Sequence, residues 1–240
     1  MRSSRSALDP LDPGPTGFAH RGLHGPGVPE NSHAAFEAAI ELRAGIECDV
    51  RLAGSRTAVV FHDETLVRMC GVALDVESTP AALLAGQRLA GSGDYIPSLS
   101  DVLEQVNGRV PLLLELKTRN GNAEMLCREV VSNLTPGAGA IDLMSFDPTV
   151  CRWLRRNAPY VRRGLVLDAG LPLLKRWIFL LVASPQFLAV NRKALGSSWV
   201  KRMRQRMPVY SWTIRTADER AQAEVQADAL IWEGDGRPRN

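Results

Sequence analysis

The sequence predicts an α/β fold, and an eight-stranded (β/α)8 barrel fits it better than an open sheet. Short apolar runs typical of strands alternate with amphipathic segments typical of helices along nearly the whole chain. Charged and histidine side chains stand at the ends of several of these runs, and a barrel that gathers strand ends would bring them into one pocket. With 240 residues, of which 45% are hydrophobic, the chain can bury a substantial core.

Nine segments have the length and composition of strands. They are residues 17–20, 46–52, 57–62, 110–117, 140–146, 164–168, 187–191, 209–214 and 229–232. Nine strands are one too many for an eight-stranded barrel. Only residues 53–56 separate the second segment from the third, whereas parallel neighbours need a connection of about a dozen residues. These two segments therefore form a hairpin, or one of them is not a strand.

Amphipathic segments fit as helices between most of these strands. They are residues 33–43, 98–106, 122–134, 148–157, 173–182, 197–206 and 217–225. Ser32 can cap the first of them and Gly45 can end it. Residues 80–97 form a longer irregular connection after the third strand-like segment. We interpret it as a lid or a short insertion in a single domain.

Two further segments concern the start of the folded domain and the possibility of a membrane span. Residues 1–15 are polar and proline-rich without the apolar core of a signal peptide, and we interpret them as a disordered leader before a folded domain at 16–240. Residues 171–190 are apolar, but Lys175, Arg176 and Pro185 interrupt them, so they are too short for a membrane span. We expect no transmembrane segment and a buried helix here. Peripheral contact with lipid is the alternative.

The composition indicates which kinds of partner and which cellular compartment to expect. A formal net charge of +3 without a long basic run gives no reason to expect nucleic acid binding, and the arginine clusters at 152–163 and 201–206 are interpreted as solvated helix faces. The four cysteines contain no C-x-x-C pair, which indicates a reducing compartment and therefore the cytoplasm. Nothing in the sequence indicates the oligomeric state.

Three carboxylates in two of the predicted strands indicate a metal site. Because side chains alternate along a strand, Glu47 and Asp49 share one face, and so do Glu115 and Lys117. Acidic side chains within apolar strands are costly unless a positive charge compensates them. Three carboxylates without thiolates or a His-x-x-x-His pair favour Mg²⁺ or Ca²⁺, with Mn²⁺ or Zn²⁺ less suited.

Two histidines also stand at strand ends. His20 and His62 could supply an acid and a base near neutral pH, while Arg21 and Lys117 would attract an anion. Together with the metal site, this set predicts the cleavage of a phosphate ester. Glu30, beside the entry of the first helix, remains available to the metal or to a substrate hydroxyl. Two other histidines, His24 and His33, lack a strand context and are assigned to the surface.

The combined motifs resemble the glycerophosphodiester phosphodiesterase family over residues 17–234. The matching residues are His20-Arg21-Gly22, Pro29-Glu30-Asn31-Ser32, Glu47-x-Asp49, His62-Asp63, Ile96-Pro97-Ser98-Leu99, Glu115-x-Lys117, Ser145-Phe146 and Trp212-Thr213. The resemblance implies a TIM-barrel hydrolase that cuts glycerophosphodiesters to glycerol 3-phosphate and an alcohol with the help of a divalent metal. Residues 53–56 depart from the family's Thr-x-Asp-Gly turn, and residues 232–238 match its closing Thr-Asp-x-Pro only loosely.

When the roles of the family's motif residues are transferred to the matching positions of this chain, the resemblance implies roles for nine residues. His20 and His62 are the acid–base pair, with His62 favoured as the base. Glu47, Asp49 and Glu115 are the metal ligands; Arg21, Lys117, Glu30 and Trp212 contact the substrate. A neighbouring substrate hydroxyl could attack first and form a cyclic phosphate.

Two other functions are compatible with the sequence. One is a phospholipase C-like or sphingomyelinase D-like enzyme acting on membrane lipids, suggested by the arginines at 152–163 and the apolar residues 177–183. The other is a non-enzymatic barrel that binds a phosphorylated ligand. The identity of the leaving alcohol stays open.

Overall fold

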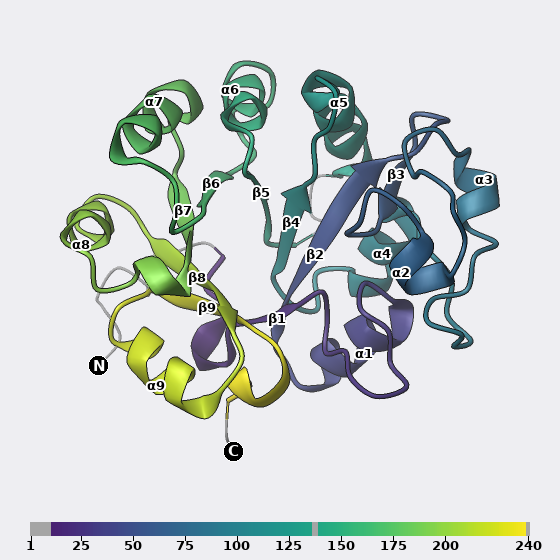
Figure 1. Ribbon diagram of the computed structural model, residues 1–240, viewed down its shortest axis with the longest axis horizontal. Helices are drawn as coiled ribbons and strands as arrows, with labels where there is room; N and C mark the ends of the chain where they lie inside the picture. The colour runs from purple at the N-terminus through teal and green to yellow at the C-terminus, as the bar shows by residue number, and fades with distance from the viewer. Residues whose placement is uncertain (1–10, 136–138, 239–240) are drawn as a thin grey trace.

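The computed structural model describes residues 11–135 and 139–238, and eight of its strands form a closed parallel barrel (Figure 1). The strands are β1 Phe18–His20, β2 Gly45–Leu52, β4 Leu112–Leu116, β5 Ile141–Ser145, β6 Arg163–Leu167, β7 Phe187–Asn191, β8 Val209–Ile214 and β9 Ala229–Trp232. They follow one another in the order β1-β9-β8-β7-β6-β5-β4-β2, and the pairing of β1 with β2 closes the circle. The predicted (β/α)8 barrel is confirmed.

The ninth strand-like segment is the second arm of a hairpin. Strand β3, Ala58–Val60, pairs antiparallel with β2, with Val60 opposite Val50. The backbone N–H of Ala53 donates to the carbonyl of Thr57 at 2.8 Å and closes the turn. The hairpin alternative predicted from the short 53–56 connection is therefore the correct one.

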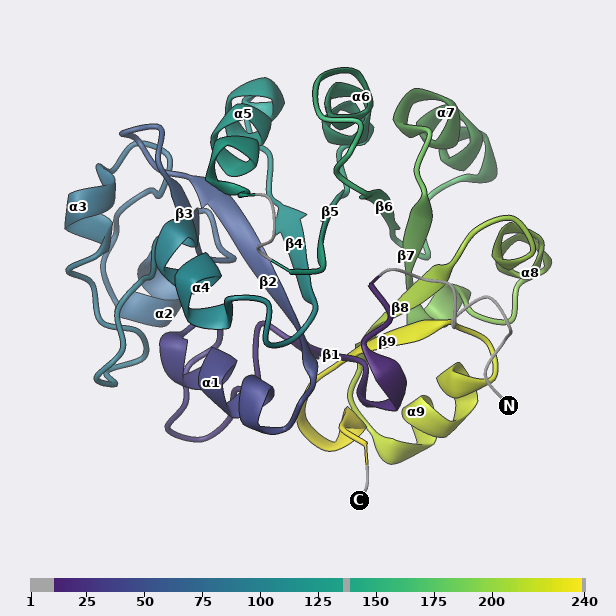
Figure 2. The same cartoon turned by 180° about the vertical axis from the view of Figure 1, so that it is seen from behind.

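Helices surround the barrel on its outer side, as the two opposite views in Figures 1 and 2 show. They are α1 His33–Glu41, α4 Leu99–Val106, α5 Ala123–Asn133, α6 Pro148–Asn157, α7 Leu173–Ala183, α8 Ser198–Arg204 and α9 Ala217–Glu224. Ser32 caps α1 as predicted, its hydroxyl accepting the N–H of Ala35 at 3.1 Å. That helix ends at Glu41, before Gly45, which instead begins β2.

An insertion follows β3 and is larger than predicted. It contains the short helices α2 Val67–Cys70 and α3 Ala81–Leu84 and runs on to Ser98, the cap of α4. Its apolar side chains form a separate cluster that includes Phe61, Leu66 and Ile96. The cluster explains why the insertion is ordered, because it buries its own apolar surface beside the barrel.

The alternation of side chains along β2 and β4 is as predicted. Cys48 and Val50 belong to the core between the barrel and its helices, and so do Leu112, Leu114 and Leu116. Leu113 instead belongs to the cluster inside the barrel. Pairing places Asp49 opposite Glu115, so both acidic strands present their carboxylates at the same level of the barrel.

The expected leader at 1–15 is corrected in part. Residues 1–10 lie outside the described residues, but residues 11–15 belong to the fold. Leu11 is fully buried among the interior side chains, next to Phe18. The carbonyl of Pro15 accepts a hydrogen bond from Arg220, and that of Thr16 accepts one from Trp232.

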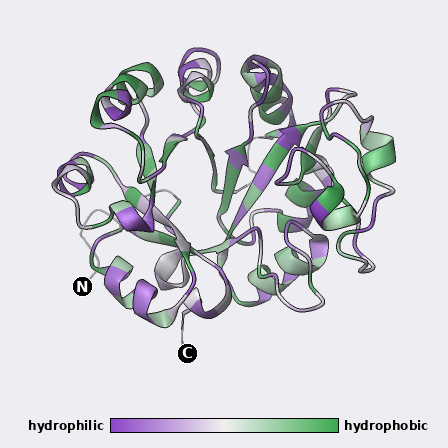
Figure 3. Cartoon of the chain, in the orientation of Figure 1, coloured by the Kyte–Doolittle hydropathy of each residue, from purple (hydrophilic) through white to green (hydrophobic). Residues whose placement is uncertain are grey.

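The expectation of a buried helix within 171–190 is wrong. Helix α7 buries only Ala183 completely, whereas Leu174 is 73% exposed and Leu181 78% exposed. Figure 3 shows this outer helix as one of the most apolar segments of the fold. The prediction failed because the helix is apolar on nearly all sides, a pattern usually found in buried helices. None of the helices in the described part of the chain has the length and hydropathy needed to cross a bilayer.

Replacing Leu11 with Ala should lower the free energy of unfolding by about 2–5 kcal/mol, because a fully buried leucine is removed from the barrel interior. Denaturant unfolding measures the change. Leu181→Ala is the matched control, and its effect should be close to zero, since that side chain is largely exposed. Equal stability of the Leu11→Ala variant and the parent would contradict the packing of Leu11.

Candidate active site

The predicted residues meet in a cavity of about 200 Å³ at the carboxyl ends of the barrel strands. Its lining contains His20, Arg21, Glu47, His62, Glu115, Lys117, Met144, Phe146, Trp212, Thr213, Arg215 and Ile231. The sequence therefore predicted seven of the lining residues individually. The other two predicted residues are not among the lining residues: Asp49 contacts Arg21 and Lys117, and Glu30 contacts Arg21.

The turn after β1 explains the spacing of His20, Arg21 and Gly22. Arg21 and Gly22 both have a positive φ, of 56° and 79°, which turns the chain sharply over the barrel end. A Cβ at Gly22 would lie 2.8 Å from the Cβ of Ala35, so helix α1 leaves no room for a larger residue. The turn also points the backbone N–H of Arg21 at Glu47, 3.1 Å away.

Three carboxylates lie close together at this site. Glu47, Asp49 and Glu115 each offer an oxygen atom, and these atoms lie within 4.8 Å of one another. All three side chains are buried. Burial, together with repulsion from Asp49 and Glu115, raises the pKa of Glu47 well above its usual value. Three negative charges so close together require compensation by cations.

Arg21 and Lys117 supply part of this compensation. The ammonium of Lys117 lies 3.1 Å from Asp49 Oδ1 and 2.5 Å from Glu115 Oε1, and Nε of Arg21 lies 3.1 Å from Asp49 Oδ2. Burial works against ionisation of Asp49, but Lys117 and Arg21 outweigh it and lower the pKa of that carboxyl. The same contacts raise the pKa of Lys117 against its own burial, so it stays charged.

Glu30 holds cations in place and is not free, contrary to the sequence-based expectation. Its carboxylate accepts hydrogen bonds from Arg21 at 2.8 Å and from Arg68 at 2.6 Å. Next to it, the side-chain amide of Asn31 donates to Asp49 Oδ2 at 2.9 Å. The segment before α1 thus fixes Arg21 and Asp49 relative to each other.

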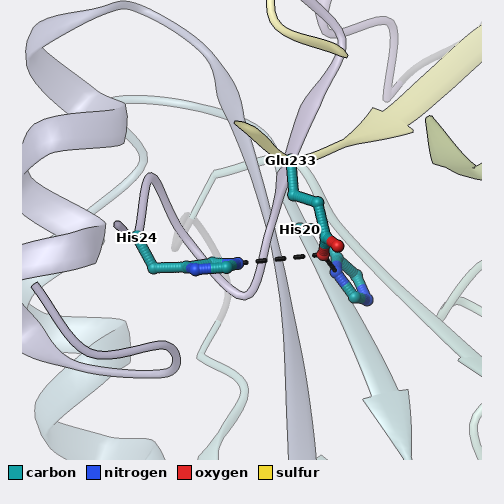
Figure 4. Close-up of side chains that lie close together, drawn as sticks. All are labelled: His20, His24 and Glu233. Atoms are coloured by element: carbon teal, nitrogen blue, oxygen red, sulfur yellow. Dashed lines mark hydrogen bonds and ion pairs between the residues drawn. The ribbon is translucent and has the colours of Figure 1, made fainter. Parts of the chain in front are cut away.

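His20 is oriented by a residue that the sequence interpretation missed. Its Nδ1 lies 2.5 Å from Oε2 of Glu233, the residue that follows β9 (Figure 4). Its Nε2 faces Glu47 Oε2 at 4.0 Å. Burial lowers the pKa of His20, and the hydrogen bond to Glu233 opposes this. The signal for Glu233 was its position directly after the last strand, in the segment that matched the family only loosely.

His24 was assigned to the surface, and the structure corrects this. Its Nε2 lies 3.8 Å from Glu233 Oε2, on the side opposite His20 (Figure 4). The other histidine assigned to the surface, His33, is half-buried and bonds Gln105 at 2.6 Å, away from the cavity.

His62 also lines the cavity, and its surroundings match those of His20. Its Nδ1 contacts Asp63 Oδ1 at 2.7 Å, and Arg68 in turn donates to Asp63 Oδ2 at 2.6 Å. Burial lowers the pKa of His62 as well. In both histidines a carboxylate thus fixes Nδ1, which leaves Nε2 for other partners.

An aromatic pair forms one wall. Trp212 and Phe146 pack edge to face, with ring centroids 5.4 Å apart, and the ammonium of Lys117 lies 5.7 Å from the centroid of the Phe146 ring. The placement of Trp212 in the lining agrees with its predicted position.

The carboxylate cluster fits a divalent cation. All the donors are carboxylate oxygens, the set that hard cations prefer. In addition, Glu47 Oε1 is buried and has no hydrogen-bond donor among the residues that the structure describes. A buried carboxylate oxygen without a donor is costly, and a bound cation would satisfy it.

Comparisons with known proteins agree with this geometry. Residues 20–233 match the model of the glycerophosphoryl diester phosphodiesterase family. A glycerophosphodiester phosphodiesterase of Caldanaerobacter subterraneus is 32% identical over 168 residues, covering 64% of this chain and 67% of that protein.

Two solved structures show the same fold. One is a phosphodiesterase of Oleispira antarctica in complex with the product sn-glycerol-3-phosphate (TM-score 0.83, 23% identity, covering 92% of this chain and 94% of that one). The other is a glycerophosphodiester phosphodiesterase of Thermotoga maritima (TM-score 0.74, 22% identity, covering 90% and 92%).

The barrel fold and the match to this family identify the chain as a phosphoric diester hydrolase. The alternative of a non-enzymatic barrel that only binds a phosphorylated ligand is therefore rejected. The chain belongs to the glycerophosphoryl diester phosphodiesterase family.

Replacing Glu233 with Gln should lower the pKa of His20, because the carboxylate that stabilises the imidazolium is removed while burial remains. An NMR titration of the four histidines in EDTA measures the shift. The Asp235→Asn variant alters a nearby exposed carboxylate and should leave the pKa of His20 unchanged. An unaltered or raised pKa in Glu233→Gln would show that the contact does not form in solution.

Proposed function

We propose that this protein hydrolyses glycerophosphodiesters to glycerol 3-phosphate and an alcohol with a divalent metal, in the cytoplasm and in glycerol and lipid metabolism. The observation that carries the proposal is the pair of carboxylate-anchored histidines, His20 and His62, which line one cavity beside a cluster of three carboxylates. The Oleispira antarctica relative, whose structure holds sn-glycerol-3-phosphate, supports the same product here. The four cysteines are unpaired, which suits a reducing compartment.

Glu47, Asp49 and Glu115 would hold the metal, with Mg²⁺ or Ca²⁺ favoured because every donor is an oxygen. When bound, the metal would neutralise the carboxylates and polarise a phosphate oxygen. Arg21 and Lys117 contribute fixed positive charge at the cavity, where the phosphate would lie. Negative charge that develops on the phosphate in the transition state is thereby stabilised without reorganisation of the site.

The histidines would exchange protons with the substrate. His62 takes the proton of the glycerol hydroxyl next to the phosphate as that oxygen attacks phosphorus, and His20 donates a proton to the departing alkoxide. The products of this step are a cyclic phosphate and the free alcohol. Water then opens the ring, with His20 as the base and His62 returning its proton to the glycerol oxygen.

We assign the acid to His20 because Glu233 contacts its Nδ1 and stabilises the imidazolium. Burial is the largest influence at both histidines and lowers both pKa values. The strongest opposing influence is the hydrogen bond to Glu233 at His20 and the charge of Asp49 at His62. A metal held by Asp49 would neutralise that second charge, whereas Glu233 would stay free to support His20.

The cavity also limits what is bound inside it. Its volume of about 200 Å³ lies below the roughly 300–1,000 Å³ of pockets that enclose drug-sized ligands. The glycerophosphoryl part would fill it, and the alcohol would extend past Phe146, which is 39% exposed. The barrel therefore selects the glycerophosphoryl group more strictly than the alcohol.

Purified protein should release glycerol 3-phosphate from glycerophosphocholine or glycerophosphoethanolamine in the presence of Mg²⁺, Ca²⁺ or Mn²⁺, and EDTA should abolish the release. Replacing Glu47 with Gln should lower kcat by about 100-fold or more, because a metal ligand is weakened. The control Glu37→Gln changes an exposed carboxylate on α1 and should retain full activity. Full metal-dependent turnover by the Glu47→Gln variant would overturn the ligand assignment.

Replacing either histidine, His20 or His62, with Ala should lower kcat on glycerophosphocholine by about 10²–10⁴-fold. A p-nitrophenyl diester of glycerol phosphate separates the two roles, because its leaving group departs without a proton. The His20→Ala variant should recover much of the release of p-nitrophenol and the His62→Ala variant little. The reverse pattern would exchange the two roles, and His33→Ala serves as the control.

A further inference from the structure

The charge of this protein is distributed unevenly along the chain. Residues 148–217 contain fourteen Lys and Arg but one acidic residue, Asp168, which is a net charge of +13. The whole chain has 29 basic and 26 acidic residues, so the other 170 residues carry a net charge of −10. The segment 148–217 supplies helices α6, α7 and α8, which are neighbours on the outside of the barrel (Figure 1).

The middle helix of the three presents a continuous apolar face to solvent. Leu173, Leu174, Trp177, Ile178 and Leu181 are between 38% and 78% exposed. At 100° per residue these positions fall within an arc of about 140° on one side of α7. The opposite side packs on the barrel through Phe179, Leu180 and Ala183. A monomeric protein rarely leaves such a stripe in water without a partner.

Exposed cations lie on α7 itself and on the two helices beside it. Arg152, Arg155 and Arg156 on α6 and Lys175 on α7 are exposed, and none of them forms an ion pair with any residue that the structure describes. Lys201 and Arg202 on α8 are likewise exposed and unpaired there. On the opposite side of the barrel, two exposed arginines, Arg68 and Arg109, are paired with carboxylates.

We propose that the α7 face, with the cations of α6 and α8 around it, docks on a lipid bilayer that carries anionic headgroups. Exposed leucines and a tryptophan can enter the boundary between headgroups and acyl chains, while the surrounding Lys and Arg attract the anionic surface. A second copy of this chain suits the face less, because the two cationic borders would repel each other. Nucleic acid would use the cations but would leave five apolar side chains in water.

Docking through α7 would bring the opening of the active-site cavity close to the lipid surface. Helix α7 starts at Leu173, six residues after the end of β6, so Leu173 and Leu174 lie at the rim formed by the carboxyl ends of the strands. The cavity opens at the same end. Docking through the first turns of α7 therefore holds the cavity mouth beside the lipid surface. The proposal concerns binding only and does not depend on the activity proposed above.

Co-sedimentation with vesicles tests the proposal. The protein should bind vesicles of phosphatidylcholine with phosphatidylglycerol, bind pure phosphatidylcholine much more weakly, and be released from the anionic vesicles by high salt. The double variant Leu174→Glu/Leu181→Glu should lose binding. The double variant Arg155→Ala/Lys175→Ala should weaken it by about 30-fold, at roughly fivefold per cation removed.

Two controls keep the result specific. Leu83→Glu changes an exposed apolar residue on α3, which is 59% exposed, and should not alter binding. Both double variants should keep the parent's circular dichroism spectrum and its turnover of a soluble diester. Absence of binding to the anionic vesicles, or equal binding by the parent and the two double variants, would overturn the proposal. Tighter binding to single-stranded RNA than to vesicles, or a parent dimer that Leu174→Glu/Leu181→Glu dissociates, would assign the face to those partners instead.

Discussion

The pairing of buried carboxylates with two cations inside the barrel governs the rest of this structure. Glu47, Asp49 and Glu115 are removed from water, and Lys117 and Arg21 lie within contact distance of Asp49. Such charges are tolerated only where geometry holds the opposite charges close. The surrounding hydrogen bonds serve this requirement: Asn31 bonds Asp49, and Glu30 holds Arg21. The barrel end is therefore organised by electrostatics, whereas its middle is organised by apolar packing.

Much of this arrangement could be predicted from the sequence because it follows from local rules. Strand alternation alone places Glu47 with Asp49 and Leu112 with Leu114, and the short connection at 53–56 excludes a crossover helix between β2 and β3. The boundaries of β7, β8 and β9 agree with the predicted ranges residue for residue. These elements have strong apolar patterns, which depend little on what packs against them.

The wrong predictions concern residues whose surroundings depend on contacts with distant parts of the chain. Leu11 belongs to a polar, proline-rich segment, and only its insertion into the barrel interior makes it part of the core. Glu233 contacts His20, 213 positions earlier in the chain, and no local pattern marks that contact. The prediction for α7 was wrong in the opposite direction. Its composition is that of a buried helix, but one side of the helix faces water. Burial is a property of the assembled layers, and a single segment does not determine it.

The insertion after β3 also has a consequence for how the enzyme responds to heat. His62 follows Phe61, which packs in the insertion's own apolar cluster, whereas His20 stands on barrel strand β1. The two histidines proposed to transfer protons thus belong to two packing units. Units with separate cores can open at different free energies within one protein. If the smaller unit loosens first, His62 is withdrawn while the barrel stays intact, and activity would then be lost at a lower temperature than the one at which the barrel melts.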